Sequence, residues 1–198
     1  MSRKAAISLL VIAGLIVAAG WWAISVNRQF VRLDQSVNEK WAQVQNVYQR
    51  RADLIPNLVE TVRGFAAQER TVFEEVTKAR ASATRVQLPP QALSDPRALE
   101  RFQAAQDALS GALGRLLVVV ERYPQLKSNQ NFLALQTQLE GTENRIAVER
   151  RRFNEAVRDY NTRLLLFPEH LVARLSGFQP KAYFEATPDA ATPPKVKF

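Results

Sequence analysis

The residue types that most often carry catalysis or bind metals are scarce in this chain. It has 198 residues, no cysteine and a single histidine, His170. Without cysteine, thiolate chemistry and cysteine-ligated metals are excluded, and a lone histidine with no predicted Ser or Cys partner does not indicate nucleophilic catalysis. We interpret His170 as a surface or capping residue just beyond the last long helix, and we expect no catalytic residue.

Sites that helical proteins build from facing helices are not indicated either. A di-metal centre in a helix bundle needs Glu-x-x-His pairs on two helices, and the sequence contains none. The glycine-containing stretch "SGALG" (110–114) lies inside a helical apolar pattern and does not predict a phosphate-binding loop. We therefore expect no metal, no cofactor and no enzymatic activity.

A few polar residues interrupt the apolar stripes of the predicted helices: Arg51, Glu69, Gln106, Glu143 and the run Arg150-Arg151-Arg152. Some of them could form an ion pair or a hydrogen-bonded layer that fixes the register of the helices. Alternatively, they lie just beside the stripes and extend their charges to water. The second interpretation is favoured here, and the first stays open.

The surplus of positive charge does not predict nucleic-acid binding. Lys and Arg together outnumber Asp and Glu by 27 to 19, which gives a formal net charge of +8. The basic residues alternate with acidic ones along predicted helices, as in residues 143–163, and form no separate basic block. This pattern is typical of a solvated helix face, so we expect no nucleic-acid partner.

The N-terminus carries a candidate membrane segment. Residues 5–24 contain no charge, and their number matches the roughly 20 residues that a helix needs to cross the hydrocarbon of a bilayer. Trp21 and Trp22 stand at the far end, where indole rings prefer the headgroup level, and Arg28 follows. We predict a retained single-pass membrane anchor. The alternative is a signal peptide cleaved near "VAAG" (17–20).

The orientation of the anchor is less strongly indicated, because basic residues flank both of its ends. Arg3 and Lys4 precede the segment, while Arg28, Arg32 and Lys40 follow it. A short N-terminus that begins with basic residues often stays inside the cell. We accordingly lean towards an extracytoplasmic domain.

Apolar residues recur at helical spacing along the rest of the chain. The longest stripe repeats every seven residues, which is typical of coiled-coil-like packing between near-parallel helices; its members are Phe132, Leu139, Ile146, Phe153, Tyr160 and Phe167. Three shorter stripes run through residues 37–48, 55–79 and 99–120. Proline-containing breaks separate the later helices, with Asp95 and either Ser128 or Asn129 as candidate N-caps.

Pro56 decides how many helices precede residue 84. One helix over residues 30–84 would be ~80 Å long, about twice the length of its expected neighbour at 96–122. Asp53 and Asn57 are candidate caps, and Pro56 lacks the amide that a helix interior needs. We therefore predict a turn at residues 53–56.

The predicted fold is all-α. An N-terminal transmembrane helix precedes an antiparallel up-and-down four-helix bundle, with helices at about 30–52, 55–84, 96–123 and 129–167. The expected divisions are a membrane anchor (1–28), a bundle domain (29–186) and a disordered proline-rich tail (187–198). Ahead of the tail, Phe178, Tyr183 and Phe184 are expected to fold back onto the bundle, with a partner-binding strap as the alternative.

Three long stretches resemble one bacterial family, in the same order and with the same spacing. They are "QRRADLIPNLVETVRGFAAQE" (49–69), "LQTQLEGTENRIAVERRRFNEAVRDYN" (135–161) and "FPEHLVARLSGFQPKAYFEA" (167–186). On these residues the chain resembles the LemA family of membrane-anchored helical proteins. His170, Arg174 and Ala182 depart from the pattern expected in many members. The resemblance implies a transmembrane helix followed by a helical domain, and it implies no reaction, cofactor or active-site residue.

Together, these features predict a non-catalytic interaction or scaffold module held at the membrane. It would contact the lipid bilayer through residues 5–24 and bind protein partners, or a second copy of itself, through helix faces. The alternative from another class is a periplasmic bundle that binds a ligand or partner after its signal peptide has been cleaved.

Overall fold

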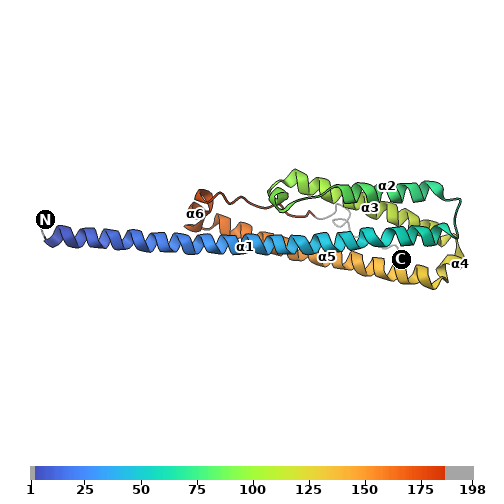
Figure 1. The fold of residues 1–198 in the computed structure, drawn as a ribbon, viewed down its shortest axis with the longest axis horizontal. Helices are drawn as coiled ribbons and strands as arrows, with labels where there is room; N and C mark the ends of the chain where they lie inside the picture. The colour runs from blue at the N-terminus through green and yellow to red at the C-terminus, as the bar shows by residue number, and fades with distance from the viewer. Residues whose placement is uncertain (1–2, 186–198) are drawn as a thin grey trace, which may run out of the picture.

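The structure, a computed structural model, describes residues 3–185, where every regular element is a helix or a 3-10 turn and residues 176–185 follow the last helix without regular structure (Figure 1). Its elements are α1 (Arg3–Arg63), α2 (Arg70–Arg85), the 3-10 turn η1 (Pro90–Ser94), α3 (Pro96–Glu121), α4 (Pro124–Lys127), α5 (Gln130–Leu165) and α6 (Glu169–Leu175). The predicted helical class and the long apolar N-terminal helix are confirmed. The predicted tail (187–198) lies outside the described residues.

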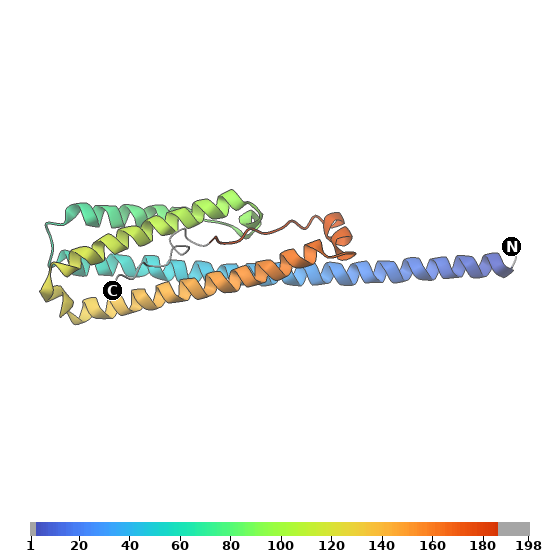
Figure 2. The same cartoon turned by 180° about the vertical axis from the view of Figure 1, so that it is seen from behind.

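The long helices lie side by side in an elongated domain. α5 runs along the C-terminal two thirds of α1 in the opposite direction, and α2 and α3 form a second antiparallel pair beside them (Figures 1 and 2). The short α4 joins α3 to α5 at the end farthest from the N-terminus, while α6 lies at the opposite end of α5. The first part of α1 extends beyond all other helices.

The turn predicted at residues 53–56 is wrong. α1 continues through Pro56 and ends at Arg63, so the chain reverses direction between residues 64 and 69 instead. The proposed caps therefore lie inside a helix, where Asp53 accepts a hydrogen bond from Gln49 Nε2 at 2.8 Å. The turn was predicted because a long first helix would have exceeded the helix at 96–122 in length. In the structure α1 instead pairs with the 36-residue α5 and also carries the apolar extension, so its length needs no turn.

A side chain from α2 explains how α1 accommodates Pro56. Proline has no amide hydrogen, so the carbonyl four residues earlier, that of Ala52, loses its usual helical partner. Arg80 Nε donates a hydrogen bond to this carbonyl oxygen at 2.7 Å. Because Ala52 is buried, an unpaired carbonyl there would be costly, and the arginine removes that cost.

The caps predicted for the later helices are confirmed. The Asp95 carboxylate accepts a hydrogen bond from the Arg97 amide at 3.0 Å, with Pro96 at the first position of α3. Asn129 Oδ1 accepts one from the Phe132 amide at 3.0 Å at the start of α5. Both side chains satisfy amides that have no partner within their own helix.

The predicted stripes form most of the core, which is divided into two clusters. The cluster nearer the N-terminal extension includes Val37, Trp41, Phe102, Phe153 and Tyr160. The distal cluster includes Ile55, Val62, Leu113, Leu116 and Phe132. Phe167 was predicted to continue the seven-residue stripe, but α5 ends at Leu165 and the Phe167 side chain is 79% exposed.

Candidate functional site

A buried arginine lies between the two core clusters. Arg51 is 1% exposed and follows Tyr48 of the first cluster by one helical turn, while Ile55 of the second cluster comes one turn later. On α3 and α5, Gln106 and Thr142 occupy the same level and are the other buried polar residues of the described core. We call Arg51, Gln106, Ser110, Thr142 and Glu143 the polar layer.

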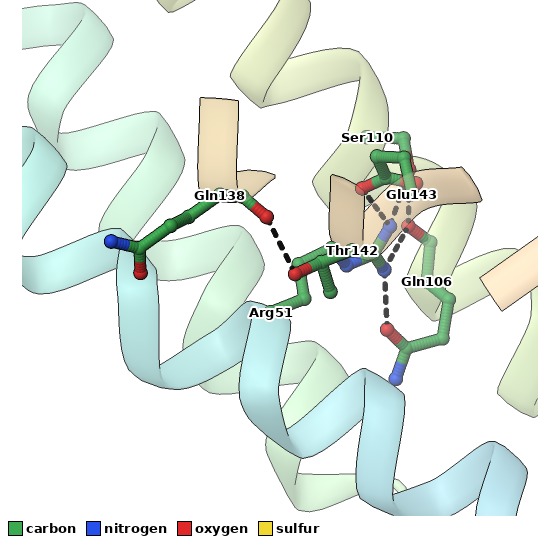
Figure 3. A network of polar contacts seen from close by, with 6 residues as sticks. All are labelled: Arg51, Gln106, Ser110, Gln138, Thr142 and Glu143. Carbon is green, nitrogen blue, oxygen red and sulfur yellow. Dashed lines mark hydrogen bonds and ion pairs between the residues drawn. The ribbon is translucent and has the colours of Figure 1, made fainter. Parts of the chain in front are cut away.

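Hydrogen bonds from the Arg51 guanidinium connect three helices (Figure 3). Nη1 donates to Ser110 Oγ at 2.8 Å and to Glu143 Oε1 at 2.9 Å. Nη2 donates to the side-chain oxygen of Gln106 at 2.6 Å and to its carbonyl oxygen at 3.2 Å. The amide of Gln106 continues the network by donating to the carbonyl of Ala83 in α2 at 3.3 Å. All four long helices thus contribute to one level.

The layer corrects the interpretation favoured from the sequence for three of the polar residues. Arg51, Gln106 and Glu143 form the hydrogen-bonded layer that was the other alternative, and their charges are not simply directed to water. Glu143 keeps one side open to solvent, which reduces the cost of desolvating the ion pair. The Arg51 guanidinium stays charged, because it cannot give up its proton in a protein.

Arg51 also contacts an aromatic ring of the first core cluster. The guanidinium carbon lies 5.1 Å from the centre of the Tyr48 ring, at cation–π distance. Burial raises the pKa of the Tyr48 hydroxyl above its ordinary value of 10.0, so this phenol stays neutral at physiological pH. Gln106 and Tyr48 also line a groove of about 570 Å³ between the end of α2 and α1.

The remaining polar residues singled out from the sequence behave differently. Glu69 lies in the turn before α2 and forms an ion pair with Arg122 at 3.2 Å. Arg151 and Arg152 are exposed, as the favoured interpretation predicted. Arg150 instead contacts the C-terminal segment, donating to the carbonyl of Glu185 at 3.0 Å.

His170 lies in α6, and its ring is 5.9 Å from that of Phe167. It is half-buried, and its interpretation as a surface or capping residue stays a prediction. Within residues 3–185, no group of three or more His, Asp or Glu side chains could hold a metal ion. The absence of catalytic residues, cofactors and metals stays a prediction.

The C-terminal segment 177–185 folds back onto α1 and α5. Phe184 is buried between Trp41 and Phe153, with ring centres 6.0 and 5.5 Å away. Phe178 packs on Phe30 at 5.2 Å, whereas the side chain of Tyr183 stays largely exposed. The predicted return of the aromatic residues is thus confirmed for two of the three.

Two asparagines of α5 hold this segment, and sequence reasoning missed both. Asn154 donates to the carbonyl of Phe184 at 3.0 Å and accepts from its amide at 2.9 Å. Asn161 makes the same pair of bonds to Lys181, at 2.8 and 2.9 Å. The sequence did contain an indication of this role, because asparagine is a poor helix former and these two asparagines lie seven residues apart on one face of α5.

The chain is similar in sequence to one described family and to several named proteins. The sequence model of a family described as the LemA family matches residues 40–198. Three relatives share 29% identity over 180 residues: two magnetosome proteins, MamQ 1 and MamQ 2, from Paramagnetospirillum magneticum, and magnetosome protein MamQ from Magnetospirillum gryphiswaldense. The match covers 83% of this chain and 66% of each relative, slightly less than two thirds of their length.

Proposed function

Because the chain belongs to the LemA family, we propose that it is a single-pass membrane protein whose helical domain is a non-catalytic interaction or scaffold module. The proposal rests chiefly on α1. This is the one helix within residues 3–185 that is long and apolar enough to cross a membrane, and none of its apolar window is buried against the rest of the protein. A membrane would cover the surface that the bundle leaves open.

The length of the exposed segment supports the same proposal. Residues 5–24 in helical form span ~30 Å, the thickness of the hydrocarbon core of a bilayer. Trp21 and Trp22 at its end are both exposed, as expected of residues at the headgroup level. The helix then enters the first core cluster at Val26 and Phe30 without interruption.

We further propose that α1, α2, α3 and α5 act as one four-helix bundle. Support comes from the polar layer, in which Arg51 contacts α3 and α5 and Gln106 contacts α2. A shared, hydrogen-bonded level fixes the axial register of helices that apolar stripes alone would leave free to slide. A module of fixed register suits a scaffold, because it presents helix faces in constant relative positions.

The names of the relatives support an assembly role. They are called magnetosome proteins, and we propose that this chain likewise serves a cellular assembly at a membrane. We also propose that the membrane is the bacterial inner membrane and that the helical domain lies outside the cytoplasm, because Arg3 and Lys4 flank the N-terminal side of the apolar segment.

Extraction of membranes with alkaline carbonate, combined with mass spectrometry of the N-terminus, tests the anchor. The expected result is a chain with residues 5–24 intact that stays in the membrane pellet. A processed chain that carbonate releases would contradict the anchor and favour the cleaved periplasmic bundle instead.

Photo-crosslinking in intact membranes tests the scaffold role. A crosslinking residue replaces Val118 on α3, whose side chain is 63% exposed, and a matched one replaces the buried Leu116. A scaffold should give discrete adducts from position 118, identified by mass spectrometry, and none from position 116. If neither position nor other exposed sites on α2, α3 and α5 yields an adduct, the scaffold role is wrong.

A further inference from the structure

Exposed apolar side chains gather where α5 passes into α6. Leu165 is 84% exposed, Phe167 79% and Leu175 89%, while Leu166 and Leu171 are about half exposed. Five large apolar side chains thus face solvent within eleven residues of a domain that otherwise buries its apolar stripes. We call residues 165–175 the apolar corner. Such a concentration in a folded domain indicates a contact with another apolar surface.

The apolar corner lies beside the part of α1 that directly follows its apolar segment. Val172 and Ala173 of α6 belong to the same core cluster as Val26 and Phe30 of α1. Ala23, the second-last residue of the apolar segment, packs against that cluster as well. In both views α6 marks the end of the bundle that faces the N-terminal extension (Figures 1 and 2).

This level corresponds to the headgroup region of a bilayer. The rise from Ile24 to Phe30 along α1 is ~9 Å. The headgroup region on one side of a membrane is ~5–8 Å thick beyond the hydrocarbon. Because α6 packs against α1 over this interval, a membrane that α1 crosses would meet the exposed leucines of the apolar corner.

The charges at this end fit a lipid surface. Arg28, Arg32 and Arg174 are exposed there. The acid of α6, Glu169, is neutralised by Arg163 at 2.7 Å. Asp34 is likewise paired with Lys181, at 3.0 Å. Exposed cations beside exposed apolar side chains are the combination that binds anionic lipid at an interface.

We propose that the apolar corner inserts its leucines and Phe167 into the headgroup–acyl boundary of the bilayer that α1 crosses. The inference rests on the proposed anchor, since that anchor brings the corner to the membrane. The bundle then has two attachments to the same leaflet: α1, which spans it, and the corner, which enters it by ~5–10 Å as interfacial helices do. The second attachment limits how far the bundle can lean.

Depth-dependent fluorescence quenching tests this. The chain has no cysteine, so Leu175→Cys provides a single labelling site for an environment-sensitive fluorophore, and the exposed side chain makes the change tolerable. The full chain is reconstituted into vesicles of phosphatidylethanolamine and phosphatidylglycerol that contain lipids with a nitroxide either near the acyl carbonyl or deeper in the acyl chain. Val118→Cys on the distal part of α3 is the matched exposed control, and Ile12→Cys reports insertion of the anchor.

The expected result is quenching at position 175 several-fold greater than at position 118, together with quenching at position 12 by deeper nitroxides. Quenching at position 12 without quenching at position 175 overturns the inference and leaves the anchor standing. A blue-shifted but unquenched label at position 175 also overturns it, because protein rather than lipid then covers the corner. If position 12 is not quenched, the anchor fails and the inference fails with it.

Discussion

Replacing Pro56 by alanine tests the account of α1 as one continuous helix. Proline in a helix interior costs about 3 kcal/mol relative to alanine. Part of this cost is offset here because Arg80 Nε supplies the hydrogen bond that the Ala52 carbonyl lacks, and such a bond from a charged donor contributes about 1.5–3 kcal/mol. Pro56→Ala should therefore raise the free energy of unfolding by up to about 1.5 kcal/mol.

Pro56 and Arg80 should be energetically coupled, because Arg80 supplies the hydrogen bond that proline removes. In the natural chain, Arg80→Ala leaves the buried Ala52 carbonyl without a donor and should cost about 1–3 kcal/mol. In the Pro56→Ala background, the new amide at position 56 bonds to that carbonyl, so the same change should cost only a few tenths of a kcal/mol. The coupling energy in a double-mutant cycle is then about 1–2 kcal/mol.

Chemical unfolding of the full chain in mild detergent, followed by circular dichroism, measures all four corners of the cycle. Lys78→Ala is the control, because Lys78 is exposed on the same helix as Arg80. It should show no coupling to position 56. If Arg80→Ala and Pro56→Ala are additive, or if Pro56→Ala destabilises the protein, Pro56 initiates a separate helix and our account of α1 is wrong.

Three further changes test the polar layer and the core. Arg51→Met should lower the free energy of unfolding by about 2–4 kcal/mol, since it leaves the buried side-chain oxygen of Gln106 without a donor. Adding Gln106→Leu should restore part of the loss, and an unchanged unfolding midpoint would refute the role of the layer. Phe153→Ala should cost about 3–5 kcal/mol in thermal melts, whereas Phe167→Ala should cost little, and equal effects would contradict the assigned burial. Burial raises the pKa of Tyr160 to about 12, so its neutral form stabilises the fold fully below pH ~10 and this contribution is lost as pH rises through 12. Tyr160→Phe should therefore flatten the fall in stability measured between those two pH values, and an unchanged slope would contradict this.

The apolar pattern predicted most of the core because burial in a helical protein follows periodicity closely. The stripes at 37–48 and 99–120 are buried throughout, and the caps at Asp95 and Asn129 were predictable because capping is decided within four residues. The prediction that Phe167 is buried was wrong, because periodicity does not indicate where a helix ends. The boundary depends on Pro168 and on the packing of α6, which the stripe itself does not contain.

The features that sequence reasoning misplaced depend on partners distant in the chain. Local chemistry at Pro56 indicates a helix start, and only the arrival of Arg80, 24 residues later, makes a continuous helix acceptable. Whether Arg51 is buried or directed to water likewise depends on Gln106 and Glu143 meeting it from two other helices. Asn154 and Asn161 acquire their role from a segment that has no periodic pattern of its own.

Because α1 is one continuous helix, it connects the apolar N-terminal segment rigidly to the far end of the domain. From Ile24 to Arg63 the helix extends ~58 Å with no joint between them. Transmembrane helices tilt by about 20° on average, by an amount that follows bilayer thickness. A tilt of that size moves the distal end sideways by about 20 Å. If α1 spans the bilayer as proposed, any tilt that the apolar corner still permits is therefore transmitted to the α1–α2 turn over the whole length of one helix.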